Sequence, residues 1–199
     1  MLLGSLDHLF GAEKTNGLRQ AILSSQDKEV QDFLRMELAR LLFQEESQPH
    51  LALREYQNVV DRRGSLAPSA QFEMVKIYLL SKQRYKAIEA CAYLIRTFPE
   101  HDLVIHARHT LKAIYAICGL KDAFFATQKE LRSDLERANN LNRLDVNSIR
   151  AQFLIDEGKI SQGIQLMEDE LEVAVREGAS EADIADMIRY IDHHRKQPK

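Results

Sequence analysis

Residues 69–99 decide the fold, and they read SAQFEMVKIYLLSKQRYKAIEACAYLIRTFP. Apolar side chains recur in this stretch every three or four residues, which is the spacing of one face of an α-helix. The pattern stops at Ser81, starts again at Arg84 and ends at Phe98-Pro99. The stretch therefore predicts two helices, over 69–81 and 84–97, joined by a short turn. The inward-facing residues are expected to be Phe72, Val75, Ile77, Tyr78, Leu79, Cys91 and Leu94.

The same helical spacing recurs on both sides of this stretch. Further helices are predicted over 27–45, 50–62, 101–118, 121–137, 144–156 and 159–177. A last helix begins at the capping box Ser180-Glu181-Ala182-Asp183 and runs to about His194. Only 8 Gly and 4 Pro occur among 199 residues, and no useful stretch alternates as a half-buried strand does. The predicted fold class is all-α.

Helix pairs recur every 34–38 residues, a period typical of helical repeat arrays. A single pair cannot bury its apolar face, so neighbouring pairs must stack into one core. The prediction is one domain over residues 1–199, with an N-terminal cap segment at 1–26. It continues with helix pairs at 27–64, 68–99, 101–138 and 144–177, and with a C-terminal capping helix at 180–195. The capping helix is expected to bury Ile184, Met187, Ile188 and Ile191.

The order of residues within the pairs resembles the tetratricopeptide repeat (TPR), in which Ala-x3-aromatic and a terminal Pro mark the second helix. Residues 69–99 are the clearest copy, since Ala87 lies near the start of the second helix and Pro99 ends it. Partial copies carry Ala39, Phe43 and Ala52-x3-Tyr56, then Tyr115, Gly119 and Ala123, and finally Ala151 and Gly163-x3-Met167. The resemblance implies a right-handed α-solenoid of about four antiparallel pairs, whose first helices line a concave surface.

Composition and motifs argue against several function classes. Lys and Arg total 27 against 30 Asp and Glu, a net charge of −3, which does not favour nucleic-acid binding. No apolar run reaches the ~20 residues of a membrane span, and no catalytic or cofactor-binding motif occurs. His106 and His109 lack further ligands at zinc-binding spacing. Cys91 and Cys118 are expected as reduced core residues of a cytoplasmic protein without metal, cofactor or enzymatic activity.

Four cations recur at close to the repeat length: Arg40, Lys76, Lys112 and Arg150, at steps of 36, 36 and 38 residues. If the copies are in register, these side chains form a ladder along the concave surface and attract an acidic peptide. Met36 and Phe72 fall one turn before Arg40 and Lys76, where they can add apolar contacts. The alternatives are that the cations are solvated helix decoration and that Met36 and Phe72 are core residues.

Two classes of function follow from the sequence. The first is a protein–protein interaction module, such as a scaffold, an adaptor or a chaperone-like protein, that binds a peptide or helix of a partner. The second is a self-assembling structural protein that associates through residues 1–10 or through the ends of the array, because five apolar residues follow helical spacing in that segment.

Overall fold

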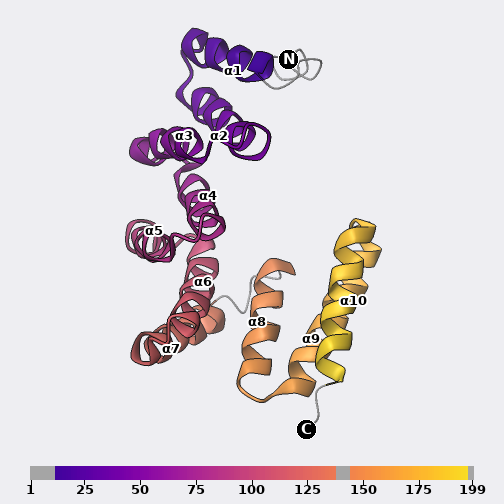
Figure 1. Cartoon of the computed structure of the whole chain (residues 1–199). Coiled ribbons are helices and arrows are strands. Elements are labelled where there is room, and N and C mark those ends of the chain that lie inside the picture. Colours follow the sequence, from indigo (N-terminus) through magenta and orange to yellow (C-terminus); the bar gives the residue numbers. More distant parts are fainter. Residues whose placement is uncertain (1–11, 138–143, 197–199) are drawn as a thin grey trace. The chain divides into compact units, whose positions relative to one another are not determined.

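The computed structural model describes residues 12–137 and 144–196, which form ten α-helices and no strand (Figure 1). The helices are α1 (Ala12–Ser24), α2 (Lys28–Gln44), α3 (Pro49–Arg62), α4 (Ala67–Leu80), α5 (Arg84–Thr97), α6 (Leu103–Ile117), α7 (Lys121–Arg137), α8 (Leu144–Asp156), α9 (Ile160–Arg176) and α10 (Glu181–Arg195). The all-α prediction is confirmed for these ranges. The observed limits of α2 to α10 lie within two residues of the predicted ones.

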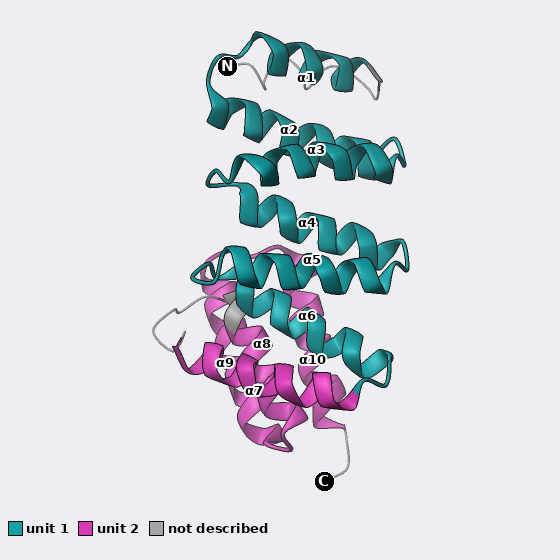
Figure 2. Ribbon diagram, turned by 90° about the vertical axis from the view of Figure 1, so that its left-hand side faces the viewer, with its two compact units in different colours: residues 1–120 teal, residues 121–199 magenta. Residues whose placement is uncertain are grey.

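The chain divides into two compact units, residues 1–120 and 121–199, shown in different colours in Figure 2. In the first unit each helix packs on the next one along the chain, and α4 also contacts α6. Figure 1 shows α2, α4 and α6 along one side of this unit and α3 and α5 along the other. The unit is therefore a row of antiparallel helices, stacked in the order in which they follow one another in the sequence.

The core of the first unit is continuous. One cluster joins α1 to α4 and a second joins α4 to α6, and Tyr78 packs against both. The first cluster includes Leu18, Leu34, Leu38, Leu42 and Val59, and the second includes Val75, Cys91, Leu94, Ala107 and Leu111, all with less than a tenth of their surface exposed. Burial of this apolar surface is the main stabilising contribution.

Four turns between helices close in the same way. Lys82, Gly119 and Gly158 take left-handed backbone conformations with φ of 59°, 70° and 81°. The next amide in each turn donates to the carbonyl five residues earlier: Gln83 to Tyr78 at 2.8 Å, Leu120 to Tyr115 at 2.9 Å and Lys159 to Leu154 at 2.9 Å. This is the Schellman arrangement, which satisfies carbonyls at the end of a helix. In the fourth turn Gly178 has a φ of 77°, and the Ala179 amide donates to the Ala174 carbonyl at 2.9 Å. The left-handed residues follow one another at steps of 37, 39 and 20.

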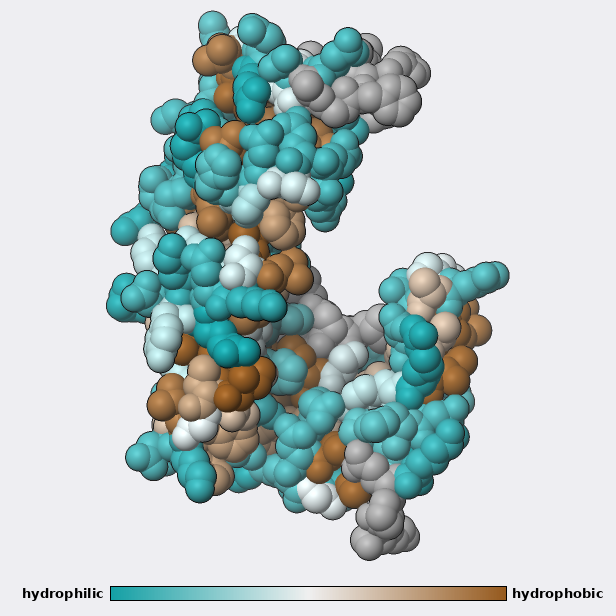
Figure 3. Space-filling view, in the orientation of Figure 1, coloured by the Kyte–Doolittle hydropathy of each residue, from teal (hydrophilic) through white to brown (hydrophobic). Residues whose placement is uncertain are grey.

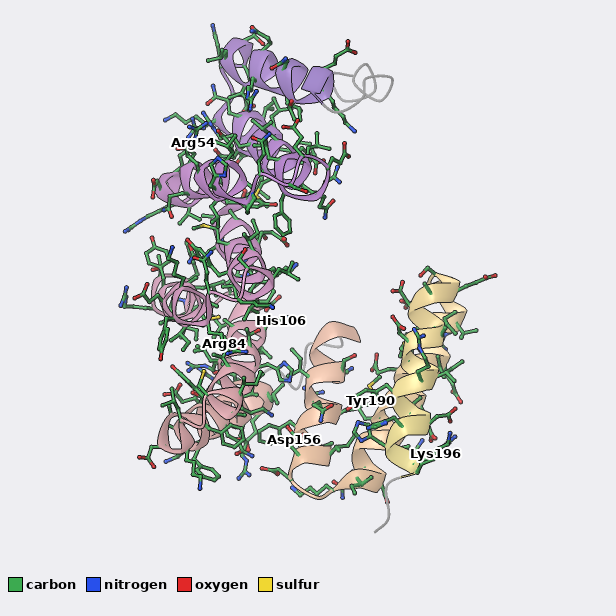
Figure 4. All side chains as sticks on the ribbon, in the orientation of Figure 1. Arg54, Arg84, His106, Asp156, Tyr190 and Lys196 are labelled. Atoms are coloured by element: carbon green, nitrogen blue, oxygen red, sulfur yellow. The ribbon has the colours of Figure 1, made fainter. Side chains whose placement is uncertain are left out.

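In the second unit, α9 packs between α8 and α10. Its core contains Ala151, Met167 and Ile191. Gly163 allows α8 and α9 to approach closely, because a Cβ there would lie 2.7 Å from the carbonyl oxygen of Ala151. Tyr190 points from α10 toward α8 (Figure 4), and its hydroxyl donates to Oε1 of Gln152 at 2.8 Å.

The last helix differs in detail from its prediction. Ser180 caps α10, since its Oγ accepts from the Asp183 amide at 3.1 Å, but the Asp183 carboxylate accepts from the Ser180 hydroxyl and completes no reciprocal capping box. Ile188 was expected inside and is 44% exposed, whereas Ile191 is 4% exposed. Tyr190 and Met187 pack beside Ile191 instead. The buried face is therefore rotated from the predicted one toward Tyr190.

Candidate functional site

Arg40 and Lys76 occupy matching places on α2 and α4. Each follows a fully buried residue, Ala39 or Val75, and each has about half of its side chain exposed. Nε and NH2 of Arg40 donate to Oε2 of Glu37 at 3.2 and 2.9 Å. Nζ of Lys76 donates to Glu73 at 2.6 Å. The same acid–cation pair, three residues apart, thus recurs after 36 residues.

Arg40 and Lys76 can exchange these acidic partners for a carboxylate of another molecule. The hydrogen bonds with Glu37 are the largest cause that raises the pKa of Arg40 above its ordinary value, and NH1 also donates to Gln44 at 3.2 Å. Ion pairs at such exposure contribute only ~0–1 kcal/mol, because water competes for both partners. A carboxylate of another molecule can therefore replace Glu37 or Glu73 at little cost.

Met36 and Phe72 lie beside the two cations and are half-buried. Met36 packs against the first core cluster and Phe72 against the second. Nζ of Lys76 lies 5.4 Å from the centroid of the Phe72 ring, and that ring meets the His106 ring edge-on at 5.9 Å. Both sequence-based interpretations apply, since these side chains touch the core and also reach the surface. We call the set Met36, Glu37, Arg40, Phe72, Glu73 and Lys76 the α2–α4 strip.

Lys112 does not extend this strip. It lies 36 residues after Lys76 on α6, yet its side chain is buried, with 4% of the residue exposed. The equal spacing predicted a third cation on the surface. The packing around α6 instead places Lys112 inside the protein.

Arg150 belongs to the second unit and has a different setting. Its NH1 donates to Oδ1 of Asn147 at 2.6 Å, and its NH2 donates to the carbonyl of Leu135 at 3.4 Å. It helps to line a cleft of about 270 Å³ between α7, α8 and α9, together with Arg132, Leu135, Glu136, Phe153, Leu154, Glu157 and Lys159. Arg150 precedes the buried Ala151, whereas Arg40 follows the buried Ala39, so the two positions are not equivalent on their helices.

Sequence reasoning missed the acidic partners and the polar contacts between helices. Glu37 and Glu73 stand three residues before each cation, a spacing visible in the sequence and favourable on a helix. The pairs between α2 and α3, Arg35 with Glu55 and Asp32 with Arg62, are 20 and 30 residues apart and left no local signal.

The comparisons with known proteins identify no family. No family model matches the chain, and no curated protein matches it significantly. Within the described residues, no group of three or more His, Cys, Asp or Glu side chains could hold a metal ion. No helix in those ranges is long and apolar enough to cross a membrane. The geometry of the α2–α4 strip is therefore the basis of the functional proposal.

Proposed function

We propose that this chain is a protein-interaction module built as a TPR-like right-handed solenoid, and that its α2–α4 strip binds an acidic segment of a partner. The solenoid part rests on repeated packing positions. Fully buried small or β-branched residues recur in successive pairs, Ala39 and Ala52 in the first core cluster and Val75 and Ala87 in the second. In the last pair, Gly163 lies close to Ala151. The Schellman turns at Lys82, Gly119 and Gly158, each between the two helices of one predicted pair, fall at steps of 37 and 39, and the one at Gly178 joins α9 to α10.

The observation that carries the binding proposal is the duplication of one surface element. A half-buried apolar residue, an acid and a cation occur at 36, 37 and 40 and again at 72, 73 and 76. Since α2 and α4 lie along the same side of the first unit (Figure 1), the two copies form a row. A bound segment could therefore make the same contact twice.

The chemistry of the strip favours a partner with both acidic and apolar side chains. Carboxylates can pair with the Arg40 guanidinium, which offers two parallel donors, and with the Lys76 ammonium. Apolar side chains can cover Met36 and the exposed part of Phe72. The peptide can be a helix or an extended chain, the two modes common for such surfaces.

A peptide-display selection against the full chain tests this proposal. We expect enriched peptides to combine Asp or Glu with apolar residues, and to lose more than tenfold in affinity, ~1.4 kcal/mol, toward the Arg40→Glu, Lys76→Glu double variant. The matched control is Arg63→Glu with Arg96→Glu, which changes the same charge at the helix ends outside the strip. Fluorescence anisotropy gives the affinities. Enriched peptides that bind both double variants as tightly as the parent would reject the strip as the site.

A second candidate is self-assembly. Exposed apolar side chains gather at the first two helices, where Leu23, Val30 and Phe33 have more than a third of their surface accessible. The segment 1–10, to which the sequence-based alternative pointed, lies outside the described residues. Sedimentation velocity over a dilution series tests this candidate, since a monomer that persists at every concentration excludes it.

The cellular setting is part of the same proposal. Both cysteines are free thiols, Cys91 buried and Cys118 half-buried. Proteins of reducing compartments such as the cytoplasm keep their thiols in this form. We therefore propose a cytoplasmic location, and trapping of thiols with maleimide in intact cells is the measurement that checks it.

A further inference from the structure

Two turns of the first unit expose large apolar side chains. Leu80 and Tyr85 flank the turn between α4 and α5 and are 69% and 80% exposed, while Ile117 at the end of α6 is 67% exposed. Leu120 follows in the next turn and is also exposed. Figure 2 shows these two turns one after the other at the same edge of the unit. We call Leu80, Lys82, Arg84, Tyr85, Lys86, Ile117 and Leu120 the turn edge.

The turn edge is basic as well as apolar. Residues 79–86 read LLSKQRYK and contain three cations and no acid. Lys82 and Arg84 form no ion pair with any residue that the structure describes, and Nζ of Lys86 lies 5.8 Å from the Tyr78 ring centroid. In a chain whose net charge is −3, this concentration of unpaired positive charge stands out. Hydrophobic patches interrupt the hydrophilic surface over α4 to α6 in the space-filling view (Figure 3).

The backbone holds these side chains in place. Gln83 donates to the Tyr78 carbonyl at 2.8 Å, and Lys82 donates to that of Leu79 at 2.9 Å. Leu120 makes the equivalent bond to Tyr115 at 2.9 Å. Because both turns have satisfied backbone groups, the exposed apolar residues belong to ordered turns and not to frayed helix ends.

We propose that the turn edge docks the protein peripherally on an anionic phospholipid surface. Leu and Ile side chains at the tips of turns can enter the boundary between headgroups and acyl chains, and Tyr favours that interface. Lys82, Arg84 and Lys86 stand in the sequence beside Leu80 and Tyr85, at the turn between α4 and α5, and attract anionic headgroups. The preceding turn on the same edge carries Glu45 and Glu46, so contact is confined to the two later turns.

A lipid surface fits these features better than a folded partner does. The apolar side chains stand at the ends of helix pairs, and a protein partner would need cavities shaped to receive them. A headgroup layer adapts to such tips and offers negative charge on every side. This docking is independent of the α2–α4 strip, which lies on α2 and α4 and not at their turns.

Co-sedimentation of the full chain with vesicles tests the proposal. One set contains phosphatidylcholine alone, and the other contains equal parts of phosphatidylcholine and phosphatidylserine. We expect binding to the second set only, weakened by added salt because surface attraction is screened. If the parent chain does not bind phosphatidylserine vesicles at low salt, the proposal is overturned. An acidic protein would then be the better candidate for this edge.

Variants separate the turn edge from general electrostatic attraction. The triple change Lys82→Glu, Arg84→Glu, Lys86→Glu and the double change Leu80→Ser, Tyr85→Ser should each lower the partition coefficient at least tenfold. The control triple Lys28→Glu, Arg63→Glu, Arg96→Glu has the same net charge as the first variant and alters the opposite ends of the helices. It should keep more than half of the binding. Equal losses in the two triple variants, with helical circular dichroism unchanged in both, overturn the proposal.

Discussion

Single small residues determine how closely helices approach in this protein. At Gly163 an added Cβ would lie 2.6 Å from Cγ1 of Ile155 and 2.7 Å from the carbonyl oxygen of Ala151. The Ile155 side chain could shift, but the carbonyl belongs to the backbone of α8 and cannot shift alone. Ala52 and Ala87, both fully buried, hold the corresponding places in the first two pairs.

Gly163→Ala is therefore expected to destabilise the second unit. At an exposed helix position the change would increase the free energy of unfolding by up to ~1 kcal/mol, because Ala has the higher helix propensity. Here the overpacking penalty of ~1–3 kcal/mol is expected to exceed that gain. Urea denaturation followed by circular dichroism measures the difference. The control is Ser161→Ala, an exposed position on the same helix, which should leave stability equal or slightly higher.

Buried titratable side chains predict weakening at alkaline pH. Burial raises the pKa of Cys91 from 9.0 to about 12, and burial with the nearby Asp156 raises that of Tyr190 from 10.0 to about 12. Between these values the unfolded chain loses protons that the folded chain keeps, so the free energy of unfolding falls. We expect the urea midpoint to be steady at neutral pH and to decrease progressively between pH 9 and about 12. A urea midpoint that stays constant over this range would contradict the raised pKa values of Cys91 and Tyr190.

The face that a helix buries is decided by its neighbours, as α10 illustrates. Four apolar residues, Ile184, Met187, Ile188 and Ile191, fit one helical stripe. Only Ile191 is fully buried, and Tyr190 adds a hydrogen bond to Gln152 on α8. Because the contact with α9 and α8 favours the side of Tyr190, Ile188 is left in solvent.

A matched pair of substitutions measures this rotation. Ile191→Ala should destabilise the protein by ~2–5 kcal/mol, the usual cost of truncating a buried Ile. Ile188→Ala removes the same atoms from a residue that is 44% exposed and should change stability by no more than ~0.5–1 kcal/mol. Thermal unfolding monitored by circular dichroism compares the two variants. Equal losses would show that the stripe expected from the sequence is the buried face after all.

At the scale of the whole molecule, the first unit contains everything its core needs. Both core clusters of α1 to α6 consist only of residues before 121, and Tyr78 joins them. Sequential packing of neighbouring helices also makes contacts local, which is typical of repeat arrays that fold from any starting point.

A fragment of residues 1–120 is accordingly expected to fold alone. It should show a helical spectrum and a cooperative thermal transition, because no side chain of its two core clusters comes from the rest of the chain. A fragment ending after α5, at residue 99, serves as the comparison, since it exposes Val75 and Cys91 by removing α6. It should melt at a lower temperature. A broad, non-cooperative transition for residues 1–120 would contradict the independence of this unit.

The sequence alone determined the helix class and the helix limits, because the signals involved act within a few residues. Proline at the start of α3, the serine cap of α10 and the left-handed glycines 119 and 158 each satisfy or remove backbone groups locally. The tertiary structure decided which side of each helix meets solvent. Arg40 follows its buried small residue and Arg150 precedes the corresponding one, a difference of two positions, or about 200° around a helix. Although the four cations recur at steps of 36 to 38 residues, Arg40 and Lys76 lie in one row, Lys112 is buried and Arg150 is turned toward α7, because long-range packing sets the rotation of each helix.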